Sequence, residues 1–240
     1  NDSLFGSGGA DTLYGADGND QILGGSESDL IYGNAGADTI SGDVGNETVQ
    51  GGAGNDLAYG GGGNDILIGG TGQDTLYGGT GNDQLSGGGD ADFLVGGITG
   101  AFGGVDTLYG GDGADTLVAG STDGDRLFGQ VGNDSLLGGT AADTLFGGGG
   151  NDVFVASTGN DIIRAGSGFD VFDVGSGFEL LGGTIDLASG DLVLELDHAV
   201  SGYQTVTFRD HAFRPLDEIQ FFESEVALTR VVIDHSLTAT

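Results

Sequence analysis

Residues 51–59 read GGAGNDLAY, residues 60–68 GGGGNDILI, residues 69–77 GGTGQDTLY and residues 78–86 GGTGNDQLS. All four are copies of one nine-residue unit with glycine at positions one, two and four, an acid at position six and an apolar residue at position eight. Two more units, GGDGADTLV at 110–118 and GGGGNDVFV at 147–155, match the same template. A repeat of this kind predicts an array of small stacked units rather than one globular core.

The acid at position six can be followed outward from these units in both directions. It defines 19 repeats, and 16 of the 18 intervals between them are nine residues long. Five extra residues stand around 98–102, where we expect a bulge that damages one site, and one stands before Asp125. The 18 aspartates of the series are Asp2, Asp11, Asp20, Asp29, Asp38, Asp56, Asp65, Asp74, Asp83, Asp92, Asp106, Asp115, Asp125, Asp134, Asp143, Asp152, Asp161 and Asp170, and the remaining acid is Glu47.

An apolar residue follows each acid two positions later, from Leu4 to Phe172, with Ala58 as the exception. A period of nine matches neither a helix nor a simple alternating strand. It predicts a six-residue turn followed by a three-residue strand, and therefore an all-β fold.

Composition narrows the possible partners. The chain has 54 Gly but one Pro, which excludes collagen, and it has no Cys for disulfides or thiolate metal sites. Its net charge of −32 excludes nucleic acid and anionic membrane surfaces as partners and points to cations. No apolar run is long enough for a transmembrane helix, which needs about 20 residues.

Each position of the unit suits a metal site. Glycine permits backbone conformations with positive φ and lets carbonyl oxygens point inward. Ca²⁺ prefers six to eight hard oxygen ligands from carboxylates and carbonyls, so the 18 aspartates are candidate metal ligands. The fourth-position glycines join them: Gly9, Gly18, Gly36, Gly54, Gly63, Gly72, Gly81, Gly113, Gly132 and Gly150. Glu47 adds a methylene, and we expect a weaker site there.

These repeats resemble the RTX (repeats-in-toxin, hemolysin-type calcium-binding) family of secreted bacterial proteins. The resemblance covers residues 1–174 and implies a right-handed parallel β-roll of about 19 repeats, two to each coil. Acids 18 residues apart then form two rows, one on each edge, with multiple Ca²⁺ ions between neighbours. The first acidic row is Asp2, Asp20, Asp38, Asp56, Asp74, Asp92, Asp115, Asp134, Asp152 and Asp170. The second acidic row is Asp11, Asp29, Glu47, Asp65, Asp83, Asp106, Asp125, Asp143 and Asp161.

The resemblance also implies a function. Repulsion between stacked carboxylates predicts a roll that is disordered without calcium and folds with it. The module would fold outside a bacterial cell, secreted or at the cell surface, after passage through a type I secretion apparatus. It would stabilise a larger secreted protein, of which the chain, beginning inside a repeat, is expected to be a piece. The alternative is a calcium-rigidified adhesive or polysaccharide-binding scaffold, for which Tyr14, Tyr32, Tyr59, Tyr77 and Tyr109 are the candidate contacts. Their spacing does not place them all on one side.

Residues 175–240 lack the repeat and are expected to form a small β-rich C-terminal cap, with strands near 192–196, 203–209 and 219–222. In the RTX family this flank also lies near the secretion signal. Three Asp-His pairs, ending at His198, His211 and His235, are interpreted as structural or surface features. No HExxH, GxSxG or P-loop motif is present, so we expect no enzyme. The ends of the roll offer a possible route to self-association.

Overall fold

The computed structural model describes residues 1–97, 103–120, 123–155, 161–168, 170–173, 178–186, 191–198, 202–209, 218–220 and 231–232. Within these residues the chain is all β, and there is no helix that could cross a membrane. From Asp2 to Asp170, a strand begins one residue after every acid of the two acidic rows. The repeat therefore sets the strand spacing directly.

The odd-numbered strands lie on one side of the molecule. They are β1 (Ser3–Gly8), β3 (Gln21–Ser26), β5 (Thr39–Val44), β7 (Leu57–Gly62), β9 (Thr75–Thr80), β11 (Phe93–Gly97), β13 (Thr116–Val118), β15 (Ser135–Leu137), β17 (Val153–Val155) and β19 (Val171–Asp173). The even-numbered strands lie on the other side. They are β2 (Thr12–Asp17), β4 (Leu30–Ala35), β6 (Thr48–Ala53), β8 (Ile66–Thr71), β10 (Gln84–Gly89), β12 (Thr107–Asp112), β14 (Arg126–Val131), β16 (Thr144–Gly149) and β18 (Ile162–Ser167).

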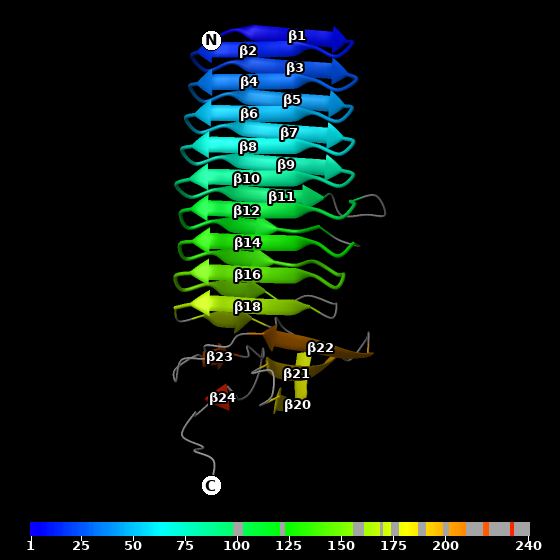
Figure 1. The fold of residues 1–240 in the computed structure, drawn as a ribbon, viewed down its shortest axis with the longest axis vertical. Helices are drawn as coiled ribbons and strands as arrows, with labels where there is room; N and C mark the ends of the chain where they lie inside the picture. The colour runs from blue at the N-terminus through cyan, green and yellow to red at the C-terminus, as the bar shows by residue number, and fades with distance from the viewer. Residues whose placement is uncertain are drawn as a thin grey trace.

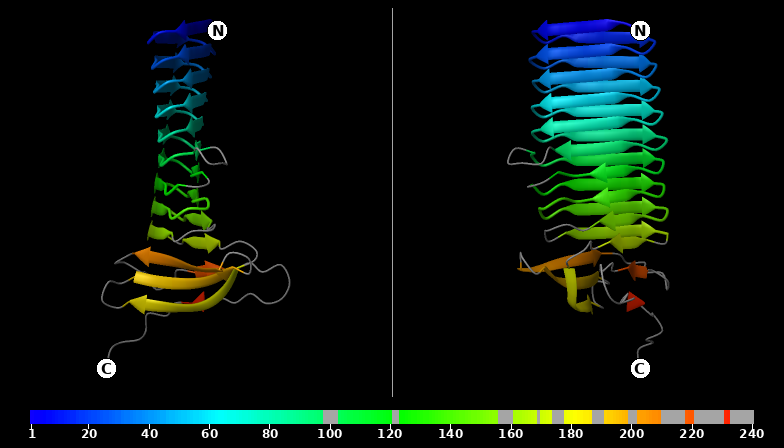
Figure 2. Two further views of the ribbon diagram at one scale, coloured as in Figure 1. Left: turned by 90° about the vertical axis from the view of Figure 1, so that its right-hand side faces the viewer. Right: turned by 180° about the vertical axis from the view of Figure 1, so that it is seen from behind.

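The two sets form two parallel sheets, in which each strand pairs with the strand two places along the chain. The molecule is thus a parallel β-solenoid, a flattened coil whose turns stack along one axis (Figures 1 and 2). In Figure 1 the even-numbered strands run to the left in front of the odd-numbered strands, which run to the right as the chain descends. The coil is therefore right-handed, as connections between parallel strands usually are.

Most strands of the first half are six residues long, which differs from the expected three-residue strand and six-residue turn. The extra length covers positions one to three of the following repeat. Gly25 at position two has φ of 115° and still pairs with Ser7 of the neighbouring coil. Parallel pairing thus continues through the glycines, and the turn shrinks to positions four to six.

The core consists of one apolar side chain from each strand. Leu67 on β8 pairs with Leu85 on β10, for example, and both are fully buried. Ala58 takes the core position in β7 with 1% of its surface exposed, while Leu57 beside it points to the opposite face of the strand. The buried eighth-position residues are Ile22, Ile31, Ile40, Val49, Ala58, Leu67, Leu76, Leu85, Leu94, Leu108, Leu117, Leu127, Leu136, Leu145, Phe154 and Ile163.

Beyond the repeats, an antiparallel meander joins β20 (Phe178–Asp186), β21 (Asp191–His198) and β22 (Gly202–Arg209). β22 continues the even-numbered sheet by pairing in parallel with β18. β23 (Glu218–Gln220) continues the odd-numbered sheet by pairing with β19, and β24 (Val231–Val232) pairs with β23. Both sheets of the solenoid are therefore extended by strands from the C-terminal segment.

Candidate metal centre

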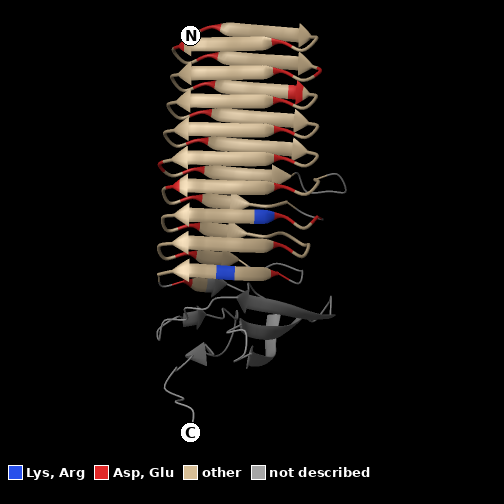
Figure 3. Ribbon diagram, in the orientation of Figure 1, with Lys and Arg blue, Asp and Glu red and all other residues tan. Residues whose placement is uncertain are grey.

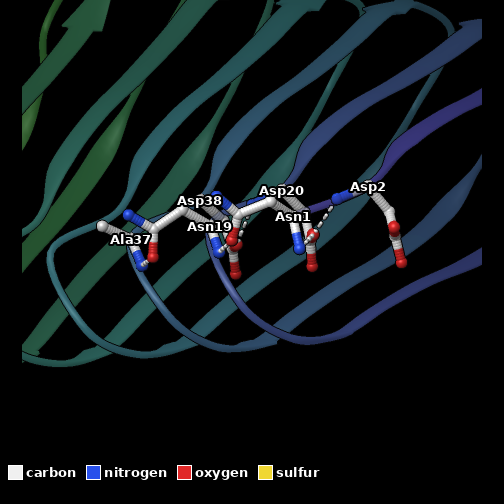
Figure 4. A network of polar contacts seen from close by, with 6 residues as sticks. All are labelled: Asn1, Asp2, Asn19, Asp20, Ala37 and Asp38. Atoms are coloured by element: carbon white, nitrogen blue, oxygen red, sulfur yellow. Dashed lines mark hydrogen bonds and ion pairs between the residues drawn. The ribbon is translucent and has the colours of Figure 1, made fainter.

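The sixth-position acids stack along the two edges of the solenoid, as the 18-residue period predicted. In the first acidic row the amide of Asp20 donates a 2.8 Å hydrogen bond to Oδ1 of Asp38, and the amide of Asp74 does the same to Asp92. Figure 4 shows the start of this row, where Asp2, Asp20 and Asp38 lie one behind another. In the second row the amide of Asp65 donates to Oδ1 of Asp83. Each row is thus a ladder linking successive coils.

These hydrogen bonds use only one oxygen of each carboxylate. In 14 of the aspartates the other oxygen is buried and has no hydrogen-bond partner. Such oxygens are Oδ2 of Asp11, Asp20, Asp29, Asp38, Asp56, Asp65, Asp74, Asp83, Asp92, Asp106, Asp115, Asp134, Asp143 and Asp152, together with both carboxylate oxygens of Glu47. An unpaired carboxylate oxygen in a low-dielectric interior costs several kcal/mol, and a bound cation removes that cost.

First-position glycines line the space in front of these oxygens. A Cβ added to Gly15 would lie 2.7 Å from Oδ2 of Asp20 and 2.7 Å from the carbonyl oxygen of Gly33 in the next coil. We call this space, between the carboxylate oxygen of one coil and the carbonyl oxygen of the next, the cradle. Gly51 and Gly69 line the same kind of cradle beside Asp56 and Asp74. Among the glycines, the sequence-based set of ligands contained only fourth-position residues. The stronger signal is the first-position glycine, which stands five residues before most of the acids, as Gly6 does before Asp11 and Gly147 before Asp152.

The fourth-position glycines bring the turns of neighbouring coils close together. Gly36 has φ of 132°, and its missing Cβ would collide with the carbonyl oxygen of Gly18 one coil earlier. Fifth-position Asn side chains reinforce this contact, because Asn19 accepts a 3.0 Å hydrogen bond from the amide of Ala37. Positive φ is found at all ten predicted fourth-position glycines, Gly9, Gly18, Gly36, Gly54, Gly63, Gly72, Gly81, Gly113, Gly132 and Gly150.

The insertion around 98–102 lies outside the described residues, yet the second acidic row passes it without a break. The amide of Asp83 donates to Oδ1 of Asp106 at 2.8 Å across 23 residues of sequence. Asp106 is fully buried, with an unpartnered Oδ2 like its neighbours. The carboxylate of Asp106 therefore keeps the same place in the ladder as the acids of uninterrupted repeats, and the expected damage to the row is not seen there.

Burial makes the carboxyl groups of the rows unusually weak acids. It raises the pKa of Asp106 to about 8, and the charges of Asp125 and Asp83 add to the shift, while the amide of Asp83 opposes it. Burial also raises the pKa of Asp83 and Asp143 to about 7. The metal-free solenoid therefore opposes ionisation of these carboxyls.

The chemistry of the donor atoms fits a hard divalent cation. Within the described part of the chain, no three His, Cys, Asp or Glu side chains gather into one metal-holding group. An ion in the cradle would therefore combine carboxylate oxygens with backbone carbonyl oxygens, which is a ligand set typical of Ca²⁺. The distribution of charge agrees, because acids mark both edges of the solenoid (Figure 3), while Arg126 and Arg164 lie in strands β14 and β18.

Aromatic side chains form short ladders on the outer sheet faces. Tyr14 stacks on Tyr32 at 4.9 Å between ring centroids, and Tyr59 stacks on Tyr77 at 5.0 Å. These two pairs lie on opposite sheets, as the sequence spacing predicted. In each pair the two rings are nearly parallel, so each covers one face of the other. This arrangement favours a role in stabilising neighbouring strands.

The three histidines of the Asp-His pairs belong to the C-terminal segment. His198 ends β21, and His211 and His235 lie outside the described residues.

A parallel β-solenoid with buried carboxylate oxygens that lack partners along both edges defines a class of protein, the calcium-binding solenoids. The family model for the RTX calcium-binding nonapeptide repeat (4 copies) matches this chain over residues 1–30, 15–46, 41–76, 68–98, 101–136, 119–154 and 146–178. The chain belongs to the RTX family, and it is a calcium-binding module. A comparison with curated proteins gave no match.

Proposed function

We propose that the aspartates of the two acidic rows bind the calcium ions, together with carbonyl oxygens of the glycine-rich turns. The observation that carries this proposal is the series of buried Oδ2 atoms without partners. Most of these atoms face a carbonyl oxygen across a space that only glycine leaves open, as at Gly15, Asp20 and Gly33. The fourth-position glycines contribute by allowing the turns to approach one another.

Calcium would then act as a folding switch. Stacked strands lie about 4.8 Å apart, and two carboxylates at about 5 Å repel by roughly 3 kcal/mol at an effective dielectric constant near 20. The thin core of one apolar side chain per strand offers little to oppose this repulsion. An ion present at ten times its dissociation constant adds about 1.4 kcal/mol per site. Repeated over many sites, binding decides whether the solenoid forms.

This switch suits a protein that folds outside the cell. The chain would remain unfolded in a cytosol poor in calcium, pass through a type I secretion apparatus, and fold where calcium is millimolar. The folded module would then stabilise a larger secreted bacterial protein. Such a role requires weak sites, with dissociation constants of about 10⁻⁴ to 10⁻³ M, as in extracellular calcium modules.

The division of the chain into a calcium-binding roll and a C-terminal cap is part of the same proposal. Residues 1–174 would form the calcium-binding roll of about 19 repeats, and residues 175–240 would cap its C-terminal end. Pairing of β22 with β18 and of β23 with β19 supports the cap, because it covers strand edges that would otherwise be open. The module would act by folding and rigidity rather than by catalysis, and its ends would allow self-association.

The test is far-UV circular dichroism during a calcium titration of protein stripped with EDTA, with Mg²⁺ as control. The expected result is a cooperative change from coil to β structure between about 0.1 and 10 mM Ca²⁺, with no change in Mg²⁺. A fully folded solenoid in EDTA would contradict the switch and would leave the repeats as a permanently rigid scaffold.

A further inference from the structure

Glu47 differs from every other acid of the two rows by one methylene, and the structure shows where the extra length goes. At ordinary coils, a Cβ on the first-position glycine would meet the Oδ2 of the acid. At Gly42 the Cβ would instead meet Cγ of Glu47, at 2.6 Å. The carboxylate of Glu47 therefore lies beyond the cradle that the aspartates use.

The displaced carboxylate reaches the fourth-position turn. A Cβ on Gly45 would meet both Oε1 of Glu47 and the carbonyl oxygen of Glu27 in the preceding coil. Only 1% of Glu47 is exposed, and neither Oε1 nor Oε2 has a hydrogen-bond partner. Oδ1 of an aspartate in the rows accepts a hydrogen bond from a backbone amide, whereas no backbone amide donates to either oxygen of Glu47.

Other negative charges surround this carboxylate. Asp65 acts on it most strongly among these acids, and the charges of Asp29 and Asp43 also act on it. Ionised carboxylates carry no donor, so Glu47 and Asp65 can face each other favourably only around a proton or a cation. Asp43 is an additional acid that occupies the second position of the same repeat, where glycine is the rule.

We propose that Glu47 binds its own calcium ion through both carboxylate oxygens, with the carbonyl oxygen of Glu27 and the carboxylate of Asp65 as neighbouring ligands. This inference rests on the proposed function of the rows. A Glu that binds with two oxygens is a known calcium ligand, and affinity rises with the charge of the ligand set. The sequence predicted a weak site here, but the structure points to a site of a different kind.

The experiment is infrared spectroscopy of the whole chain carrying glutamate labelled with ¹³C in its side-chain carboxylate. The Glu47 band is isolated by subtracting the spectrum of Glu47→Asp, which restores the residue of the other repeats. On addition of Ca²⁺, this band is expected to show the narrowed splitting between antisymmetric and symmetric stretches that marks bidentate binding. Glu27→Gln is the matched control and should retain the band change, because the Glu27 carboxylate bonds to the amide of Gly9.

A second readout is the number of ions bound at saturation. Glu47→Gln should lose one ion, whereas Glu47→Asp should keep the wild-type number. If calcium folds the chain while the Glu47 band does not move, or shows the wider splitting of one-oxygen binding, the Glu47 site is refuted and the proposed function stands. If calcium neither binds to the wild-type chain nor folds it, the proposed function itself fails.

Discussion

At the scale of single residues, aspartate supplies the oxygen ligands of the repeat and glycine leaves the space for the ion. The carboxylate of Asp74 joins two coils because its Oδ1 accepts a hydrogen bond from the amide of Asp56, and its Oδ2 is left for an ion. Gly69 keeps clear the space that Oδ2 faces. Neither residue makes the site alone, so a change at either should alter the response to calcium.

Asp74→Asn should have opposite effects in the two states. With calcium, loss of one charged oxygen ligand should raise the calcium concentration at the folding midpoint and reduce the ion count. Without calcium, removal of a buried charge should raise the free energy of unfolding of the solenoid. Circular dichroism in calcium buffers measures the midpoint, with Asp17→Asn as the control, because Asp17 is exposed. A midpoint shift as large in the control would contradict a specific role for Asp74.

Gly60→Ala tests the cradle without changing any charge. The new methyl group would lie 2.6 Å from the carbonyl oxygen of Gly78 and would crowd Oδ2 of Asp65. Overpacking of this kind costs about 1–3 kcal/mol, and the calcium midpoint should rise. Gly89→Ala is the matched control, because nothing lies within 4 Å of a Cβ there. Equal midpoints for the two variants would show that the cradle is not the binding space.

At the scale of the element, each strand contributes one buried side chain and one rung of backbone pairing. Leu76 on β9 pairs with Leu94 on β11 and is fully buried between neighbouring coils. A strand this short cannot be stable alone, and its stability comes from the coils above and below it. Loss of one core residue should therefore weaken the coils on both sides.

Leu76→Ala should lower the free energy of unfolding in saturating calcium by about 2–5 kcal/mol. Urea denaturation measures this change. Gln84→Ala on β10 is the control, since Gln84 is exposed and should change stability little. If Leu76→Ala is as mild as the control, the stability of the coil comes from its ions and not from its core.

At the scale of the whole molecule, two rows of buried acids link folding to protons as well as to calcium. Burial raises the pKa of Glu47 and Asp106 to about 8 and that of Asp92 to about 7, from ordinary values near 4. The metal-free folded state therefore holds more protons than the unfolded chain between about pH 4 and 8. Its stability must fall as pH rises through this window.

In EDTA, the β signal in circular dichroism should be stronger at pH 5 than at pH 8. In calcium the direction reverses, because protons compete with the ion for the same oxygens, and the calcium midpoint should be higher at pH 5 than at pH 7.5. A metal-free chain whose signal does not change between pH 5 and 8 would contradict the burial of these carboxylates.

The sequence by itself determined the architecture and the rows. Each nine-residue repeat contains one apolar residue and one acid, and the chain has few ways to bury every apolar residue while aligning every acid. The strand spacing, the core positions and the pairing of Asp20 with Asp38 were therefore all predictable. Tertiary structure alone decided that strands run on through the glycines, that Gly15 and its equivalents line the cradle, and that Asp106 keeps its place in the row. It also decided that Glu47 reaches a different turn. These features depend on distances between coils, which a period along the chain does not contain.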